Sequence, residues 1–397
     1  MALRDYQQRA ITLFYNWLSS HAGNPCIVMS TGSGKSHVIA ELCKDILTSY
    51  PQSKILVLSH VKELLAQDAE KIQLAWGDTA PLGIYSAGIG RKELGYSITV
   101  AGIQSVRDKS EALGFIDLVI VDEAHLISHK AEGGYRNLLD GLKTINPALR
   151  IVGLTATPYR LGHGLISENG AIFDDLIEPV KIEELIVRGF LTPLRSKLTQ
   201  AALAVDGVGK RGGEFIESEL QAKVNNEDDN ERIVAEVIAR SEGRNAWLFF
   251  CTGVAHACAM RDVLLSHGIS AAAILGKTPK DERSRLISDF KSGALKALTN
   301  ADVLTTGFDY PGIDLIAMCR PTMSPGLYIQ MAGRGMRIAP GKEDCLVLDF
   351  AGNVKRHGPV TDVQPPKHKG AGTGEAPVKI CDECAELVHA SVKVCPC

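Results

Sequence analysis

The chain has 397 residues, of which 45% are hydrophobic and 22% charged, which is the composition of a globular protein. This length exceeds what one ordinary hydrophobic core serves, so two or three domains are expected. No apolar run reaches the roughly 18 to 20 residues of a membrane helix, and the N-terminus lacks the apolar stretch of a signal peptide. We therefore expect a cytoplasmic protein without a membrane partner. Because the net charge is −3, any nucleic-acid binding must come from local patches.

The first part of the chain alternates short apolar runs with amphipathic helical patterns. Runs rich in Val, Ile and Leu predict strands at 25–30, 54–59, 98–101, 116–122 and 150–155. Helical patterns between them include 36–48 and 61–76. Near-continuous apolar strands separated by helices predict a parallel sheet that is buried on both faces.

The same alternation returns in the second part of the chain. Further strands are predicted at 246–251, 271–275, 294–299, 315–319 and 345–350, so the sequence predicts two α/β domains in series. We expect a first domain at 1–198, a connecting segment at 199–229 and a second domain at 230–353, with Asn230 capping a new helix. Residues 354–379, rich in Pro, Gly and Lys, predict a flexible linker before a Cys-rich tail at 380–397.

Residues 26–36 read CIVMSTGSGKS, an apolar strand followed by a glycine-rich turn and the start of a helix. The backbone N–H groups of such a turn bind phosphate, and the helix N-terminus adds its positive end. In this pattern Lys35 reaches the β- and γ-phosphates, and the Ser36 hydroxyl ligates Mg²⁺. Met29 stands where the pattern has glycine, so the loop is a variant. The residues expected around the phosphates are Thr31, Gly32, Ser33, Gly34, Lys35 and Ser36.

A carboxylate pair, Asp122 and Glu123, follows the apolar run at 116–122. A carboxylate at the end of a strand beside a phosphate loop can hold Mg²⁺, usually through water. The neighbouring carboxylate can then orient and deprotonate the attacking water. Gln7 precedes the loop, and its amide offers the donor and the acceptor needed to read the edge of adenine.

Over about residues 3–353 the chain resembles the superfamily 2 helicases of the DEAH type. LRDYQ resembles the adenine-reading Q motif, STGSGKS motif I, SHVKELLAQ motif Ia, AGIQSV motif Ib and VDEAH motif II. LTATPYR resembles motif III, WLFFCT motif IV, LTTGFDYPGIDLI motif V and QMAGRGMR motif VI. Within this family the sequence most resembles the RadD branch of bacterial DNA repair helicases. The resemblance lies in the segments LVLSHVKELLAQ, LTATPYRLG and RPTMSPGLYIQMAGRGMRIAPGKEDCLVLDFAGN.

This resemblance implies two tandem RecA-like P-loop domains, with ATP in the cleft between them and nucleic acid across their top. It implies that Arg334 and Arg337 are arginine fingers supplied by the second domain. A planar, permanently charged guanidinium suits the charge that develops on a transferring phosphoryl group. The resemblance also assigns Arg4 and Gln7 to adenine, Gly307 and Asp309 to the ribose side, and His125, Thr155, Thr157 and Gln330 to coupling.

Nucleic-acid contacts are implied by the same resemblance. They fall at Ser59, His60, Lys62, Gln104, Ser105, Thr252 and Thr305. Hydroxyls, amides and backbone N–H groups at strand ends bind phosphates and read no sequence, which fits a motor that slides. The alternative for each of these residues is a structural role such as capping a helix.

Four of the ten cysteines crowd into the tail, CDECAELVHASVKVCPC. Cys381 and Cys384 can form one half of a tetrahedral zinc site, and Cys395 and Cys397 can supply the other half. His389 is an alternative ligand, and a loose tail of reduced thiols is the alternative to zinc. RadD-like proteins carry Cys-rich segments after the motor, which favours zinc.

The function expected from the sequence is a nucleic-acid-dependent ATPase of the DEAH helicase type, with ATP and Mg²⁺ as cofactors and Zn²⁺ in the tail. DNA, single-stranded or branched, is the expected partner, and the expected role is repair or recombination. One alternative is a translocase or remodeller of DNA–protein complexes that does not separate strands. Another is a DNA-binding factor switched by ATP whose tail recruits a protein partner. RNA also stays open as a substrate, because contacts to phosphate do not read the 2′-OH.

Overall fold

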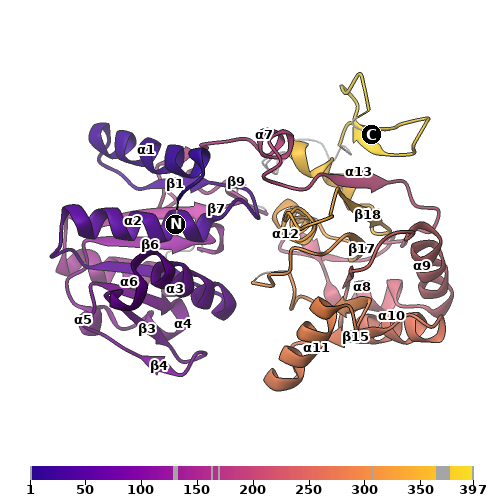
Figure 1. The fold of residues 1–397 in the computed structure, drawn as a ribbon, viewed down its shortest axis with the longest axis horizontal. Helices are drawn as coiled ribbons and strands as arrows, with labels where there is room; N and C mark the ends of the chain where they lie inside the picture. Colours follow the sequence, from indigo (N-terminus) through magenta and orange to yellow (C-terminus); the bar gives the residue numbers. More distant parts are fainter. Residues whose placement is uncertain are drawn as a thin grey trace. The chain divides into compact units, whose positions relative to one another are not determined.

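The computed structural model describes residues 2–127, 133–161, 164–168, 170–305, 307–363 and 376–395. The chain divides into two compact units, Met1–Lys181 and Ile182–Cys397, and each has its own sheet (Figure 1). Both units have the RecA-like α/β plan that the sequence predicted. In the part of the chain described, no helix combines the length and the apolar character needed to cross a membrane.

The first unit is built on an eight-stranded sheet in the order β10-β1-β7-β6-β2-β5-β3-β4. Neighbouring strands are parallel except β3 and β4. The strands are β1 (Pro25–Val28), β2 (Ile55–Ser59), β3 (Leu82–Ser86), β4 (Arg91–Lys92), β5 (Ile98–Gly102), β6 (Leu118–Asp122), β7 (Arg150–Thr155) and β10 (Asp175–Ile177). The five strands predicted here are confirmed and adjoin one another in the sheet, whereas the unpredicted ones lie at its edges.

Helices cover both faces of this first sheet. Leu138 and Leu142 of α6 pack against Val119 and Val121 in one cluster, while Ile120, which points to the opposite face, is also fully buried. The helices are α1 (Asp5–Ser20), α2 (Lys35–Ser49), α3 (Lys62–Trp76), α4 (Ile103–Val106), α5 (Ser110–Leu113) and α6 (Gly134–Ile145), with short 3₁₀ turns at Gly77–Thr79 and Ala124–Leu126. A small hairpin of β8 (Tyr159–Arg160) and β9 (Gly164–Leu165) lies between β7 and β10 in the chain.

The second unit is built on a six-stranded parallel sheet in the order β11-β18-β17-β14-β16-β15. Its strands are β11 (Leu194–Lys197), β14 (Trp247–Cys251), β15 (Ala271–Ile274), β16 (Ala297–Asn300), β17 (Leu315–Cys319) and β18 (Cys345–Asp349). Its helices are α7 (Ile182–Val187), α8 (Glu217–Val224), α9 (Glu227–Arg240), α10 (Val254–Ser266), α11 (Lys280–Ser292), α12 (Pro325–Ala332) and α13 (Asn353–His357). The five predicted strands are again confirmed, and the edge strand β11 is the one that the sequence did not predict.

The boundary between the units differs from the predicted one. The structure divides the chain after Lys181, and β11 pairs with β18, so residues 182–198 belong to the second unit. The predicted connecting segment, 199–229, also packs on that unit. Its apolar residues Leu203, Phe215 and Leu220 join the core that contains Trp247, because they follow the edge strand onto one face of the sheet.

The helix after this segment begins earlier than predicted. The side chain of Asn226 accepts the backbone N–H of Asp229 at 2.9 Å and caps α9. Asn230, the predicted cap, lies inside the helix and is buried. Three acidic residues in the first turn of α9, Glu227, Asp228 and Asp229, complement the positive helix end.

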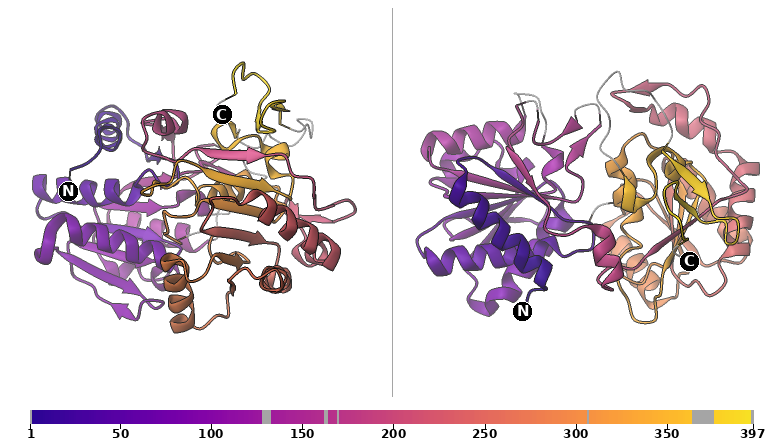
Figure 2. Two further views of the ribbon diagram at one scale, coloured as in Figure 1. Left: turned by 45° about the vertical axis from the view of Figure 1, so that its right-hand side comes forward. Right: turned by 90° about the horizontal axis from the view of Figure 1, so that it is seen from above.

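The predicted flexible linker is ordered at its start. Val354 of α13 is fully buried, and the hydroxyl of Tyr328 donates to the carbonyl of Gly358 at 3.0 Å. Residues 364–375 lie outside the described part of the chain. Beyond them, β19 (Val378–Ile380) and β20 (Leu387–His389) form an antiparallel hairpin, in yellow at the C-terminal end of the second unit (Figure 2). Lys197 pairs with Glu386, so this hairpin docks beside β11.

Candidate ATP site and nucleic-acid interface

The phosphate loop lies between β1 and α2 of the first unit. Gly32 and Gly34 have φ angles of 84° and 87°, in the left-handed region that glycine adopts readily. A Cβ atom at Gly34 would also lie 2.5 Å from Nε2 of Gln7. Met29 does not have a positive φ, is fully buried, and donates its backbone N–H to the carbonyl of Thr155 at 2.9 Å. Glycine is therefore required at the tight part of the loop and not at position 29.

Gln7 fixes the loop from α1. Its Nε2 donates to the carbonyl of Ser33 at 2.9 Å, and its Oε1 accepts the backbone N–H of Arg4 at 3.0 Å. The hydroxyl of Tyr6 donates to the same Ser33 carbonyl at 2.9 Å. The Gln7 amide still has one N–H and one lone pair beyond these bonds. Reading adenine thus stays a prediction for Gln7, and its contact with the loop is an observed one.

Two carboxylates follow the end of β6 beside this loop. Nζ of Lys35 lies 3.6 Å from Oε1 of Glu123, and both side chains are almost buried. Asp122 is 2% exposed, and its Oδ1 has no hydrogen-bond partner among the described residues. Glu123 has a φ of 50°, which turns the chain sharply as it leaves the strand. The predicted lysine and carboxylates therefore converge on one site.

A third carboxylate, Asp68 of α3, lies in the same site and was not predicted. Asp68 is fully buried. Burial raises the pKa of Asp68 to about 7, with Glu123 adding to the rise. Burial and the Asp68 charge in turn raise the pKa of Asp122 well above its usual value. The sequence did carry a signal, because Asp68 shares the apolar helix face of Leu65 and Ile72.

This donor set fits a divalent cation. Three carboxylates, those of Asp68, Asp122 and Glu123, lie near the ammonium of Lys35, and carboxylate oxygens are ligands that Mg²⁺ prefers. The Ser36 hydroxyl faces the same group, since it lowers the pKa of Asp68 against the larger effect of burial. Ser36 and Asp122 thus both interact with Asp68, and their joint binding of Mg²⁺ stays a prediction.

His125 links the carboxylates to the next strand. Its Nδ1 lies 2.8 Å from the hydroxyl of Thr155 and 3.3 Å from Oε2 of Glu123. The Thr155 hydroxyl also accepts the backbone N–H of Thr157 at 3.0 Å. Three of the residues predicted to couple ATP to nucleic acid therefore form one buried chain of contacts. The fourth, Gln330, lies in α12 of the second unit.

The two predicted arginine fingers meet on one carbonyl in the second unit. Nη1 of Arg334 and Nη1 of Arg337 both donate to the carbonyl of Phe308, at 2.5 Å and 2.8 Å. Nε of Arg337 also pairs with Oδ1 of Asp309 at 3.1 Å. Gly307 begins the segment that carries Phe308 and Asp309. The motifs that contain these arginines and Asp309 are thus connected within this unit.

The predicted nucleic-acid contacts divide into two groups. The hydroxyls of Ser59, Ser105, Thr252 and Thr305 already bond backbone groups of the chain. His60 and Gln104 are exposed, and Lys62 is partly exposed. Because β2 and β5 are parallel neighbours, His60 and Gln104 lie at the same edge of the sheet. They line a cavity of about 180 Å³ together with Arg107 and Arg136, which the sequence did not single out.

Two family models match the chain. Residues 1–160 match "Type III restriction enzyme, res subunit", and residues 229–339 match "Helicase conserved C-terminal domain". Together with the two RecA-like units, these matches decide the family. The chain belongs to the superfamily 2 helicases.

Relatives of this superfamily 2 helicase include yeast proteins. A Saccharomyces cerevisiae protein named "Putative ATP-dependent helicase IRC3" is 28% identical over 88% of the chain and 51% of its own length. A Schizosaccharomyces pombe protein named "Putative mitochondrial ATP-dependent helicase irc3" is 29% identical over 90% of the chain and 58% of its own length. The chain therefore spans little more than half the length of these two relatives.

A solved structure shares the fold of this superfamily 2 helicase. It is a fragment of a type I restriction enzyme HsdR subunit from Vibrio vulnificus YJ016, described as putative. The TM-score is 0.66 at 22% identity, and the match covers 91% of this chain and 66% of the other.

The cysteines in the tail of this superfamily 2 helicase come together. The sulfur atoms of Cys381, Cys384 and Cys395 lie within 4.8 Å of one another, and those of Cys384 and Cys395 are 3.7 Å apart. Zn–S bonds of about 2.3 Å in a tetrahedral site place sulfurs about 3.8 Å apart, so the three thiols fit zinc. His389 bonds the Ser391 hydroxyl at 2.7 Å and does not belong to the group that the described residues form. Cys397, the predicted fourth ligand, lies outside the described residues.

Proposed function

We propose that the chain is a nucleic-acid-dependent ATPase of the DEAH type that moves on or unwinds DNA. One observation carries this proposal: the glycine loop, Lys35, Asp122 and Glu123 come together in the first unit. A phosphate loop alone supports only a nucleotide-binding protein. A buried carboxylate beside the Lys35 ammonium adds a group that can act on water.

In this proposal each residue has a distinct part in hydrolysis. The loop and Lys35 bind the β- and γ-phosphates, and Glu123 orients the attacking water and takes its proton. Arg334 and Arg337, from the second unit, stabilise the charge that develops on the transferring phosphoryl group. Mg²⁺, when held by Ser36 and Asp122, would neutralise charge on the same phosphates. His125 and Thr155 would carry changes at Glu123 toward the edge of the sheet where His60 lies.

DNA is the proposed nucleic acid, and DNA repair, as in the RadD branch, is the proposed role. Some similar proteins support DNA: a Sulfurisphaera tokodaii protein, 26% identical over 376 residues, is named "DNA 3'-5' translocase XPB2". Other similar proteins do not distinguish DNA from RNA, since the structure of Saccharomyces cerevisiae Dbp5 bound to RNA matches with a TM-score of 0.59 at 17% identity. The translocase name also favours a second candidate, movement on DNA without strand separation.

The nucleic-acid specificity can be measured directly. We expect ATPase turnover to rise with single-stranded or forked DNA and to rise less with RNA of the same sequence. Because binding rests on phosphate contacts, the DNA concentration for half-maximal stimulation should increase severalfold between 50 and about 200 mM salt. ATPase assays at both salt concentrations, with fork unwinding in parallel, test this expectation. Equal turnover with and without nucleic acid would instead favour the ATP-switched recruitment factor.

We also propose that the tail binds zinc through Cys381, Cys384 and Cys395, with Cys397 as the fourth ligand. The support is the sulfur geometry and the docking of the hairpin on β11. A bound zinc would join the turn of the hairpin to the segment that follows β20, and would present the tail to a protein partner.

Purified protein should contain about one zinc per chain, because a structural site binds a single ion. Cys384→Ser should reduce zinc to less than half of that amount, since a tetrahedral site loses one of its ligands. Cys258→Ser is the matched control, because Cys258 lies outside the group. Elemental analysis after gentle purification measures both variants. Less than half an equivalent in the unmodified chain would refute the zinc site.

A further inference from the structure

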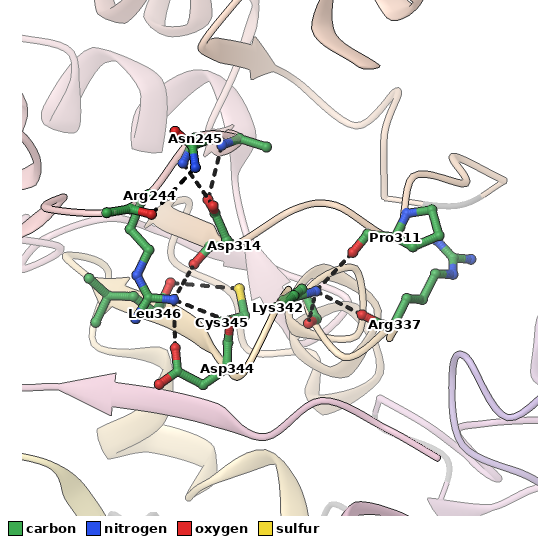
Figure 3. Close-up of polar contacts among 12 residues, drawn as sticks. Arg244, Asn245, Pro311, Asp314, Arg337, Lys342, Asp344, Cys345 and Leu346 are labelled. Atoms are coloured by element: carbon green, nitrogen blue, oxygen red, sulfur yellow. Dashed lines mark hydrogen bonds and ion pairs between the residues drawn. The ribbon is translucent and has the colours of Figure 1, made fainter. Parts of the chain in front are cut away.

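Lys342 lies between two loops of the second unit and bonds both (Figure 3). Its Nζ donates to the carbonyls of Gly335 at 2.7 Å, Arg337 at 2.8 Å and Pro311 at 3.0 Å. An ammonium group has three N–H donors, so these three carbonyls use all of them. The side chain thus acts as a clamp on backbone and not as a surface charge.

The carbonyls that Lys342 holds belong to the segments that carry the proposed arginine fingers. Gly335 and Arg337 lie in the turn after α12 that bears both arginines. Pro311 follows the segment whose Phe308 carbonyl and Asp309 carboxylate bind those arginines. Lys342 therefore contacts the two segments through their backbone carbonyls, whereas the arginines contact Phe308 and Asp309 through their guanidinium groups.

A second residue holds the same turn. The Thr192 hydroxyl donates to the carbonyl of Arg337 at 3.0 Å, and its backbone N–H donates to that of Met336 at 2.7 Å. Lys342 and Thr192 thus engage the carbonyls of Gly335, Met336 and Arg337, and Lys342 also bonds the carbonyl of Pro311. Loss of Lys342 would remove the backbone link between this turn and Pro311, while the guanidinium contacts of Arg334 and Arg337 with the Phe308–Asp309 segment would remain.

We propose that Lys342 is a positioning residue for hydrolysis. It holds the backbone of Arg337 in a fixed position relative to the Phe308–Asp309 segment. The inference rests on the proposed function, in which Arg334 and Arg337 act on the phosphoryl group. A guanidinium stabilises a transition state only when its backbone is held in place, and an error of about 1 Å can cost about a hundredfold in rate. Lys342 bonds the backbone carbonyl of Arg337 and acts through the turn.

The clamp depends on the charge of Lys342. Burial lowers the pKa of Lys342 to about 8, while Cys345 and Asp314 oppose this effect and Arg337 and Arg244 add to it. Arg244 is itself paired with Asp344. A neutral amine has two N–H donors and cannot satisfy three carbonyls, so the clamp loosens as the pH rises through 8.

Although the clamp loosens as the pH rises, the contribution of Lys342 to the free energy of unfolding should increase. The pKa of Lys342 is lower in the folded chain than the usual value of 10.5, so between about pH 8 and 10.5 the unfolded chain binds the additional proton. Lys342 therefore makes stability increase with pH in that window. If Lys342 acts on stability alone, the kcat for ATP hydrolysis should stay constant or rise above pH 8. If Lys342 positions the arginines, this kcat should fall above pH 8.

The test compares the unmodified chain with Lys342→Met, which keeps the length of the side chain and removes its donors. Lys280→Met, at an exposed lysine of α11, is the matched control. At pH 7, with saturating DNA, Lys342→Met should lower kcat about ten- to a hundredfold. Its affinity for ADP should stay within about twofold, because Lys35 and the phosphate loop are in the other unit and Arg337 still pairs with Asp309. The kcat of the unmodified chain should fall above pH 8, and that of Lys342→Met should not.

Three outcomes would overturn the proposal: an unchanged kcat at pH 7, a loss of ADP affinity as large as the loss of kcat, or parallel pH profiles. If Lys342→Met does not fold, Thr192→Val carries the test, since it removes one donor to the Arg337 carbonyl and should lower kcat with ADP affinity unchanged. A wild-type kcat in Thr192→Val would then count against the proposal. An unmodified chain without ATPase activity would refute the proposed function, which separates that failure from failure of the clamp.

Discussion

Glu123→Gln should leave the chain folded and able to bind ATP but lower kcat by about 10²- to 10⁴-fold, because glutamine cannot take a proton from the attacking water. The substitution keeps the size of a side chain that lies 3.6 Å from Lys35 and 3.3 Å from His125. It also removes one of three neighbouring carboxylates, so the thermal stability should not decrease. Steady-state ATPase assays, ATP binding and thermal unfolding measure the three expectations.

Two controls make this result specific. Glu111→Gln, at an exposed glutamate of α5, should have wild-type turnover. Lys35→Ala should lose both turnover and ATP affinity, because Lys35 binds the phosphates themselves. Near-normal turnover in Glu123→Gln, or in Lys35→Ala, would contradict the assignment of this site.

The second large effect is expected from Arg337→Lys, which should lower kcat by about 10³-fold or more. Lysine keeps the positive charge but has no planar fork, so it cannot replace Nη1 at the Phe308 carbonyl and Nε at Asp309 together. Affinity for ADP should change little, because the arginine acts on charge that develops during transfer. ATPase assays and ADP titrations separate the two effects.

Arg261→Lys is the matched control for this substitution, since Arg261 lies on α10 and pairs with the exposed carboxylate of Asp262. It should have wild-type kcat. For Arg337→Lys, a kcat within a few-fold of wild type, or an equal loss of ADP affinity, would show that Arg337 is not an arginine finger. Arg334→Lys should behave similarly, but Arg334 is buried, so its unfolding must be measured too.

Much of the fold could be predicted from local pattern. Most of the predicted strands are central ones, such as β6 and β14, whose residues are buried on both faces and therefore form continuous apolar runs. The exception is β15, an edge strand that was predicted because all of its residues are apolar. Edge strands such as β4 and β11 have an exposed side and mixed composition, so they give no such run. The domain boundary was misplaced for the same reason, because β11 marks the start of the second sheet.

The sequence by itself determined the family and the phosphate loop, because a loop that binds phosphate through its backbone needs glycines and a lysine at fixed spacing. Other features depended on residues that are distant in the chain. Asp68 joins Asp122 only because α3 packs beside the loop, and Lys342 meets Pro311 only because the strands bring their loops together. Such contacts arise from packing and have no short motif. The tertiary structure therefore decided the charge of the candidate ATP site and the anchoring of its arginines.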